Sequence, residues 1–111
     1  MIQSLPPVGN DRKRKERCCL IVVSIRNGKI EAIGHAGAGN GIVCSAISCL
    51  FQTLVASICS LTDDRIEYDI EPGSSRMIYE DLSDGSKLLI DSFFIGVCGV
   101  AEAYPDAVTI N

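Results

Sequence analysis

The stretch that decides the fold runs from residue 18 to residue 61 and reads, piece by piece, CCLIVVSIR, NG, KIEAIG, HAGAGNG and IVCSAISCLFQTLVASICSL. The first and third pieces carry β-branched or alternating apolar side chains, which are typical of strands. Asn27-Gly28 between them is the strongest short-range signal for a two-residue hairpin turn. The last piece places its large apolar residues at helical spacing. A hairpin, a glycine-rich loop over 35–41 and a helix over 42–61 are therefore predicted.

The second half of the chain predicts a similar arrangement. Residues 65–71 alternate as a strand, Pro72-Gly73 marks a turn, and residues 76–82 indicate a short return strand. A second helix is expected over 87–104, with Ser86 as its N-cap and Pro105 as its stop. The order ββαββα predicts an α/β (α+β) fold of two layers, in which two helices pack on an antiparallel or mixed sheet.

Length and composition indicate one folded domain over residues 18–111, preceded by an arm over residues 1–17. The chain has 111 residues and 47% hydrophobic side chains, which suits a single globular unit. The first 17 residues contain Pro and Gly breaks followed by a basic run over 12–17. We interpret them as a flexible basic arm. It is either a solvated tail or, through residues 12–17, a direct contact with nucleic acid.

Charge and cysteine placement argue against several classes of function. A net charge of −4 and few aromatic side chains do not suit nucleic-acid binding by the domain. The negative charge favours a substrate with a basic region. The six cysteines include no CxxC pair, so their spacing does not favour a zinc site. They are interpreted as buried and reduced, apart from Cys44. Since no secretory signal opens the chain, a cytoplasmic location is expected.

The helix predicted over 42–61 contains no charged residue and is long enough to span a bilayer. It also contains four serines, one threonine and one glutamine, and it lacks interfacial anchors. A helix of a globular domain buried on several sides is therefore favoured, and no membrane association is predicted. The apolar surface of this helix predicts an interface with a second copy, that is, a two-fold homodimer.

Two residues stand where thiol chemistry needs them. His35, the only histidine, follows a strand and opens the glycine-rich loop, and Cys44 lies just inside the start of the helix. A helix N-terminus favours a thiolate, and an imidazole within reach can take the thiol proton and later give it to a leaving amine. The pattern by itself also fits a structural histidine with a core cysteine. The loop could instead bind phosphate, although no GxxxxGK[ST] motif is present.

The remaining candidates surround this pair and are assigned to substrate binding or to the loop. Glycines lack Cβ atoms, so an extended peptide can approach the loop closely. Free N–H groups at the helix start, including that of Cys44, could hold the oxyanion of a tetrahedral intermediate. Ser48 lies one turn after Cys44 on the same helix face, where it could orient the histidine or the loop. The candidates are Gly34, Ala36, Gly37, Gly39, Gly41 and Ser48.

The segments GHA at 34–36 and IVCSAIS at 42–48 resemble the signature of the ribosomal-processing cysteine proteases, the Prp family. The hairpin at residues 27–30 and the closing Tyr104-Pro105-Asp106 with its apolar end extend the resemblance over residues 18–110. The resemblance implies that His35 and Cys44 are catalytic, and that the thiol hydrolyses a peptide bond without a metal or cofactor.

The resemblance also implies a substrate. In this family it is a large-subunit ribosomal protein, number twenty-seven, from which the protease removes an N-terminal extension as part of ribosome biogenesis. Two features depart from the family pattern: the loop between His35 and Cys44 is shorter than usual, and Gly41 stands where an Asp is common, with Asn40 as the nearest polar substitute. Two alternatives therefore stay open, a non-catalytic ribosome- or precursor-binding protein of the same fold and a structural dimerisation module.

Overall fold

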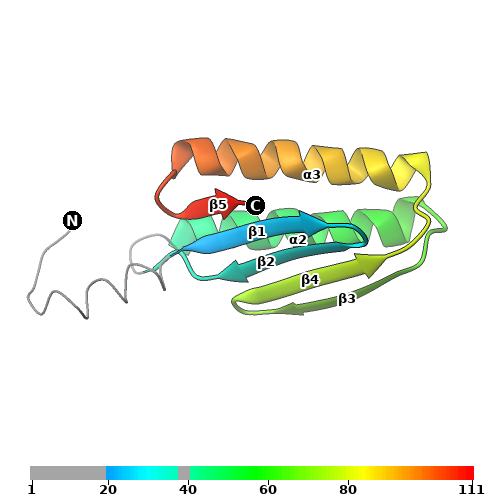
Figure 1. Cartoon of the computed structure of the whole chain (residues 1–111), viewed down its shortest axis with the longest axis horizontal. Helices are drawn as coiled ribbons and strands as arrows, with labels where there is room; N and C mark the ends of the chain where they lie inside the picture. The colour runs from blue at the N-terminus through cyan, green and yellow to red at the C-terminus, as the bar shows by residue number, and fades with distance from the viewer. Residues whose placement is uncertain (1–19, 38–40) are drawn as a thin grey trace, which may run out of the picture.

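The computed structural model describes residues 20–37 and 41–111. The predicted arm, with Cys18, Cys19 and Gly39, lies outside the described residues. The elements follow one another as β1 (Ile21–Arg26), β2 (Lys29–Gly34), α2 (Gly41–Leu61), β3 (Ile66–Glu71), β4 (Ser74–Tyr79), α3 (Asp84–Ala103) and β5 (Val108–Ile110). This is the predicted ββαββα order followed by a short strand, and Figure 1 shows its path through the molecule.

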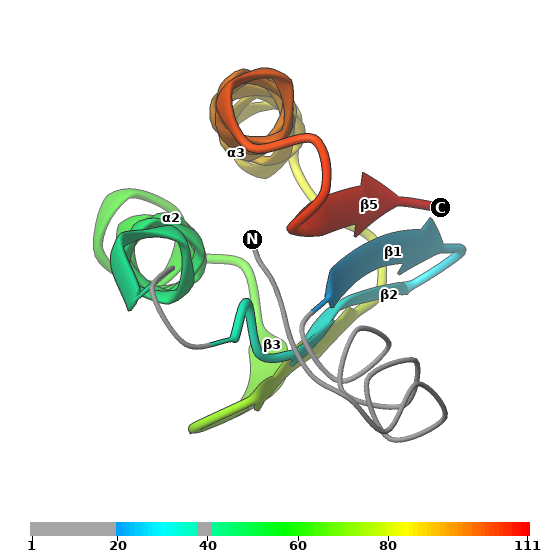
Figure 2. The ribbon, with the colours of Figure 1, turned by 90° about the vertical axis from the view of Figure 1, so that its left-hand side faces the viewer.

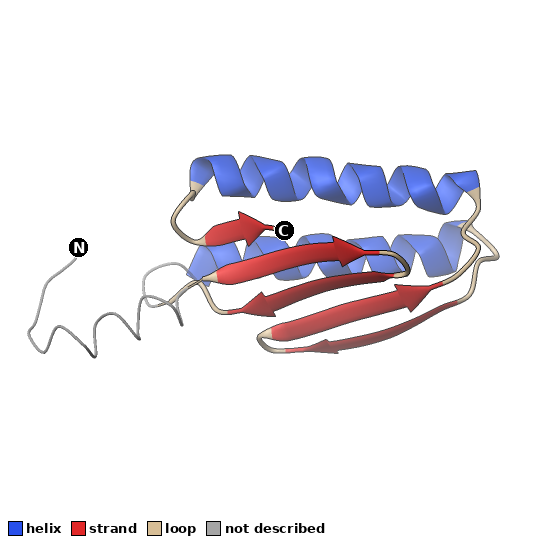
Figure 3. Ribbon diagram, in the orientation of Figure 1, coloured by secondary structure: helices blue, strands red, loops and turns tan. Residues whose placement is uncertain are grey.

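The strands form one mixed sheet in the order β3-β4-β2-β1-β5, so the predicted α+β class is confirmed. Antiparallel pairing joins β1 to β2, β2 to β4 and β4 to β3, whereas β5 lies parallel to β1. Figure 3 shows the strands as one layer, with α3 above them in this view and α2 behind them. The sheet order matters for function, because β4 lies beside β2 and the turn that precedes β4 thereby reaches the end of β2.

The first hairpin forms at the predicted turn. Arg26 pairs with Lys29, and Gly28 adopts φ +79°. This left-handed conformation is one that glycine takes without a steric penalty. The Tyr79 N–H donates to the Gly28 carbonyl at 3.0 Å, which ties the turn to the end of β4.

Both helices cover the same face of the sheet, as the end-on view in Figure 2 shows. The buried side chains of α2 face the sheet and α3, and one ring contact joins the helices: Phe51 and Phe93 meet edge to face with centroids 5.7 Å apart. The prediction of buried cysteines is wrong for Cys49, Cys59 and Cys98, whose thiols are free but exposed. The buried residues of α2 are Val43, Ile47, Phe51, Leu54, Val55 and Ile58.

By length and composition alone, α2 could cross a membrane. Its hydropathy comes partly from the six side chains that it contributes to the core. The core helix of a globular protein can be equally apolar for the same reason. The face that α2 turns outward carries small, polar or apolar residues without a charge, between Ile42 at 66% exposure and Leu61 at 73%.

The second helix begins earlier than predicted, and Ser86 is not its N-cap. Ser83 is the N-cap, and its Oγ accepts from the Ser86 N–H at 3.4 Å. Ser86 lies in the first turn, fully buried, and its hydroxyl donates to the Asp64 carboxylate. Ser83 donates to the same carboxylate through its N–H at 2.9 Å and its Oγ at 2.6 Å. We call the group Thr62, Asp64, Ser83 and Ser86 the polar clamp.

The polar clamp joins the end of α2 to the start of α3. Thr62 Oγ1 donates to the Ile58 carbonyl at 2.8 Å, accepts from the Asp64 N–H at 3.1 Å and lies 3.3 Å from the Ser86 hydroxyl, whose one proton goes to Asp64. The hydrogen bond from the Ser83 hydroxyl, followed by that from Ser86, lowers the pKa of Asp64 below its ordinary value. The clamp therefore favours the ionised form of this carboxylate.

The strand β5 closes the other end of the sheet. Two backbone bonds flank its three residues: the Ile21 N–H donates to the Ala107 carbonyl at 2.8 Å, and the Asn111 N–H donates to the Val23 carbonyl at 2.8 Å. Ala107 and Val108 are buried. This parallel pairing covers the edge of β1.

Candidate active site

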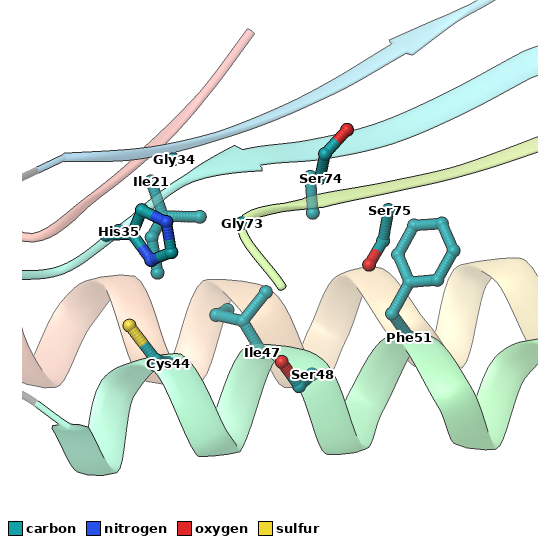
Figure 4. Close-up of a pocket in the computed structure, with 11 residues that line it drawn as sticks. Ile21, Gly34, His35, Cys44, Ile47, Ser48, Phe51, Gly73, Ser74 and Ser75 are labelled. Atoms are coloured by element: carbon teal, nitrogen blue, oxygen red, sulfur yellow. The ribbon is translucent and has the colours of Figure 1, made fainter. Parts of the chain in front are cut away.

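His35 is placed by the end of β2. Gly34 has φ +117°, and a Cβ there would lie 2.1 Å from the Leu20 carbonyl oxygen, so only glycine fits this position. The chain then leaves the sheet at His35 and returns as α2 from Gly41. Cys44 consequently lies in the first turn of α2, and both side chains line one pocket (Figure 4).

The thiol of Cys44 is half-buried and receives a backbone hydrogen bond. The N–H of Ala36 donates to the Cys44 Sγ, and the two atoms are 3.2 Å apart. Ala36 itself is 1% exposed, which anchors this donor in the core. A donor directed at sulfur stabilises negative charge there, as does the positive end of the α2 dipole. The thiol therefore lies at the helix start with a backbone donor directed at its sulfur.

The imidazole of His35 is exposed and packs against Gly73 in the β3–β4 turn. A Cβ added to Gly73 would lie 2.4 Å from His35 Nε2 and 2.8 Å from Cε1. The turn is held in place because the Gly34 N–H donates to the Gly73 carbonyl at 2.9 Å. In Figure 4 the sulfur of Cys44 points toward the imidazole ring. The absence of a side chain at residue 73 thus sets where the ring can lie.

The pocket between these groups is small, at about 40 Å³, which is room for a few water molecules. Apolar side chains close its base, and strands β1, β2 and β4 and helix α2 all contribute to its wall. An extended ligand would therefore have to lie across the opening rather than enter it. The apolar residues of the lining are Ile21, Ala32, Ile47 and Phe51.

The other predicted site residues divide into three groups. Gly34 and Ser48 line the pocket, and Ala36 reaches the thiol through its N–H. Ser48 is exposed, and within the described ranges no hydrogen bond joins it to His35. No contact there supports the expected role of Ser48 in orienting the histidine. Gly37, with φ +87°, and Gly41, exposed at the start of α2, flank the loop outside the pocket lining.

Sequence reasoning missed Gly73, Ser74 and Ser75, which form the wall opposite Cys44. The dipeptide Pro72-Gly73 was recognised as a turn, but its place beside His35 depends on β4 pairing with β2. The glycine of this dipeptide was part of the signal for a site, since a turn glycine with a positive φ can accept the close approach of an aromatic ring.

In the residues that the structure describes, no group of three or more His, Cys, Asp or Glu side chains could hold a metal ion. Nor does an Asp or Glu from these ranges line the pocket. Within the described chain, the position of the imidazole is therefore set by packing on Gly73 rather than by a carboxylate.

A free thiol at a helix start, with an imidazole in the same pocket, is an arrangement suited to nucleophilic catalysis by the thiol. The family model described as cysteine protease Prp matches residues 20–109. The chain therefore belongs to the Prp family of cysteine proteases. No protein of curated function matches it.

Solved structures share the fold. One is the essential ribosomal processing protease Prp of Staphylococcus aureus in complex with a substrate peptide, with a TM-score of 0.72, 18% identity and coverage of 83% of this chain and 96% of that one. The same protease with a covalently linked product peptide gives a TM-score of 0.71 at 20% identity, with coverage of 83% and 96%. A Streptococcus mutans protein gives 0.68 at 27% identity, with coverage of 83% and 90%.

Proposed function

We propose that this chain is a cytoplasmic cysteine endopeptidase of ribosome biogenesis, which removes the N-terminal extension of the large-subunit ribosomal protein number twenty-seven. His35 and Cys44 form its catalytic dyad. The observation that carries the proposal is the shared pocket in which the Cys44 thiol, bonded to the Ala36 N–H, points toward the His35 imidazole. The Prp family membership and the peptide complexes of the S. aureus protease support the class of substrate.

The proposed reaction has three steps. His35 takes the thiol proton as the Cys44 sulfur attacks the scissile carbonyl carbon, and N–H groups at the start of α2 stabilise the oxyanion. The tetrahedral intermediate expels the amine, which receives the proton from His35, and a thioester remains on Cys44. Water then attacks the thioester with His35 as base, and the thiol is regenerated with release of the carboxylic acid.

The proposed assembly is a homodimer formed through α2. The outward face of this helix has no charged residue and ends in two strongly exposed apolar side chains, Ile42 and Leu61. A second copy would cover them, and such faces commonly mark interfaces. Neither a cofactor nor a membrane is part of the proposal. Sedimentation at micromolar concentration that gave only the 11.9 kDa species would contradict the dimer.

A binding protein of the same fold is the second candidate. It is favoured by one observation, namely that no carboxylate of the described ranges lines the pocket beside His35. A dyad without an orienting carboxylate is weaker in enzymes that use a third group. Such a protein would hold the ribosomal precursor without cutting it.

One experiment separates the two candidates. The purified protein is incubated with the ribosomal precursor, and intact masses are measured over time. We expect two product masses whose sum is the precursor plus one water, and no change with Cys44→Ser or His35→Ala. An intact precursor that nevertheless co-purifies with the protein would support the binding protein instead.

A further inference from the structure

The strand β3 is a free edge of the sheet. It pairs with β4 on one side, and its other side carries no strand in the described ranges. Figure 2 shows it at the end of the sheet that lies on the α2 side, away from β5. The backbone N–H and C=O groups on this side are open to a further strand, and peptide-binding domains use such edges to add an extended peptide.

The two faces of β3 differ sharply in chemistry. Ile66, Tyr68 and Ile70 share the face on which β4 turns Met77 into the core, because Tyr68 pairs with Met77. Ile66 and Ile70 pack partly against the core, yet Tyr68 remains 55% exposed at this edge. An added strand would place every second side chain against this apolar face.

The opposite face of β3 is acidic. Glu67, Asp69 and Glu71 are all exposed on it. Within the described ranges, none of these three carboxylates belongs to an ion pair, although Arg76 stands opposite Asp69 in the register. Residues 20–111 as a whole hold twelve acidic and five basic side chains. A second copy of β3 would meet like charges along this edge, whereas a basic peptide would meet opposite ones.

The edge leads directly to the active site. Glu71 ends β3, and two residues later Gly73 touches the His35 imidazole. A peptide paired with β3 would continue past this turn and reach the opening that Cys44 and His35 line. The small pocket has no room for a long recognition sequence, so the edge supplies the contact area that the pocket lacks.

We propose that substrate docks by adding an extended strand to the free edge of β3, with basic side chains beside Glu67, Asp69 and Glu71 and apolar side chains beside Tyr68. This inference rests on the proposed function for the cleavage step. It makes the edge strand, rather than the pocket, the main determinant of which peptide is cut.

The first test reverses the charge of the edge. Cleavage of the ribosomal precursor is followed for the full chain, for Glu67→Lys/Asp69→Lys and for the control Asp91→Lys/Glu102→Lys, which changes net charge equally on exposed positions of α3. Two reversed surface contacts predict a KM about tenfold higher for the edge variant, with kcat almost unchanged, and less than about a twofold change for the control. Equal KM values for both variants would overturn the charge complementarity.

The second test examines backbone pairing. A synthetic peptide that spans the cleaved junction of the precursor is bound to the Cys44→Ser protein, and two further versions carry N-methyl groups on odd or on even residues. Strand addition predicts that one methylated version loses about tenfold in affinity while the other keeps it, because alternate residues donate to the edge. It also predicts slower amide exchange over residues 66–71. Two methylated peptides that bind as well as the parent, or protection confined to another element, would overturn the docking site.

These readouts keep the two proposals apart. Cleavage with no dependence on the β3 edge overturns the docking site and leaves the peptidase standing. Protection of residues 66–71 by the peptide, without cleavage by the unmodified protein, overturns the peptidase and supports the docking site in a binding protein. If the protein does not cleave the precursor and the peptide does not protect residues 66–71, both proposals are overturned.

Discussion

The two ends of α2 are built in opposite ways. At its C-terminal end, the polar clamp ties the helix to α3 with hydrogen bonds that converge on the Asp64 carboxylate. At its N-terminal end, one hydrogen bond from Ala36 reaches Cys44, and the neighbouring wall is formed by the bare Cα of Gly73. The first end holds the helices together, and the second leaves a thiol and an imidazole accessible.

This difference implies that stability and chemistry can be perturbed separately. Changes in the clamp should move the unfolding midpoint and spare the kinetic constants. Changes at the other end should alter the kinetic constants by far more than any loss of stability explains. Four experiments test this separation.

Cys44→Ser tests the chemical end most strongly. Replacement of the attacking sulfur should lower cleavage of the precursor by roughly 10⁴-fold or more. The unfolding midpoint should move by less than about 2 °C, since the side chain is only half-buried and the volume change is small. Rates come from intact mass spectrometry and midpoints from circular dichroism. Retained cleavage would show that another residue is the nucleophile.

Gly73→Ala tests the wall beside His35. The new Cβ would meet His35 Nε2 at 2.4 Å, so the ring must move, and a displacement of this size is expected to lower kcat by about 10²-fold. Gly28→Ala is a matched control, because Gly28 has the same φ of +79° in a turn remote from the pocket. Each variant should lose about 1 kcal/mol of folding free energy from the left-handed backbone. Equal activity in both would remove the positioning role of Gly73.

Asp64→Asn tests the polar clamp. The variant should unfold a few degrees lower than the parent at pH 7 and keep kcat and KM, whereas the exposed neighbour Asp63→Asn should leave both properties unchanged. Because the folded pKa of Asp64 is lowered, the ionised clamp stabilises the fold fully above the ordinary value of 3.8. That stabilisation is lost as pH falls below 3.8, so the gap between parent and variant should narrow there. A gap that widens in acid would contradict this sign.

Alkylation with limiting iodoacetamide measures the smallest effect. Cys44 is less exposed than Cys49, Cys59 and Cys98, so accessibility alone would label it last. The Ala36 N–H and the helix start predict the opposite order, with Cys44 modified about tenfold faster than Cys98 at neutral pH. Peptide mass mapping gives the order. Slower labelling of Cys44 would mean that its surroundings shield the thiol without activating it.

Local sequence patterns predicted the elements well and their contacts poorly. Asn27-Gly28 predicted its hairpin because two residues suffice to specify that turn. The start of α3 was misplaced because Ser83 and Ser86 are both good caps. What distinguishes Ser86 is its burial beside Asp64, which lies in the loop between α2 and β3 and far away in the sequence. The expectation of buried cysteines failed because α2 and α3 each bury only one side.

The candidate site was predicted only as far as it is local. His35 and Cys44 lie nine positions apart, across one loop, and they do line the same pocket. Gly73 could not be placed because its approach depends on β4 inserting beside β2 in the sheet, and alternation along a strand does not specify its neighbour. The alternation of acidic and apolar residues along β3 can be read from the sequence, but its proposed role in docking depends on β3 being an edge strand.

The parallel pairing of β5 with β1 carries a consequence for the order of folding. Ile21 and Val108 meet across nearly the whole described chain, so this contact closes one of the longest loops in the molecule. The hairpin of β1 and β2 can form at once, whereas the other edge of β1 stays open until the last strand arrives. Contacts of such high sequence separation slow folding and leave an unpaired strand exposed while it proceeds. The edge of β1 is therefore open to aggregation during folding until β5 pairs with it.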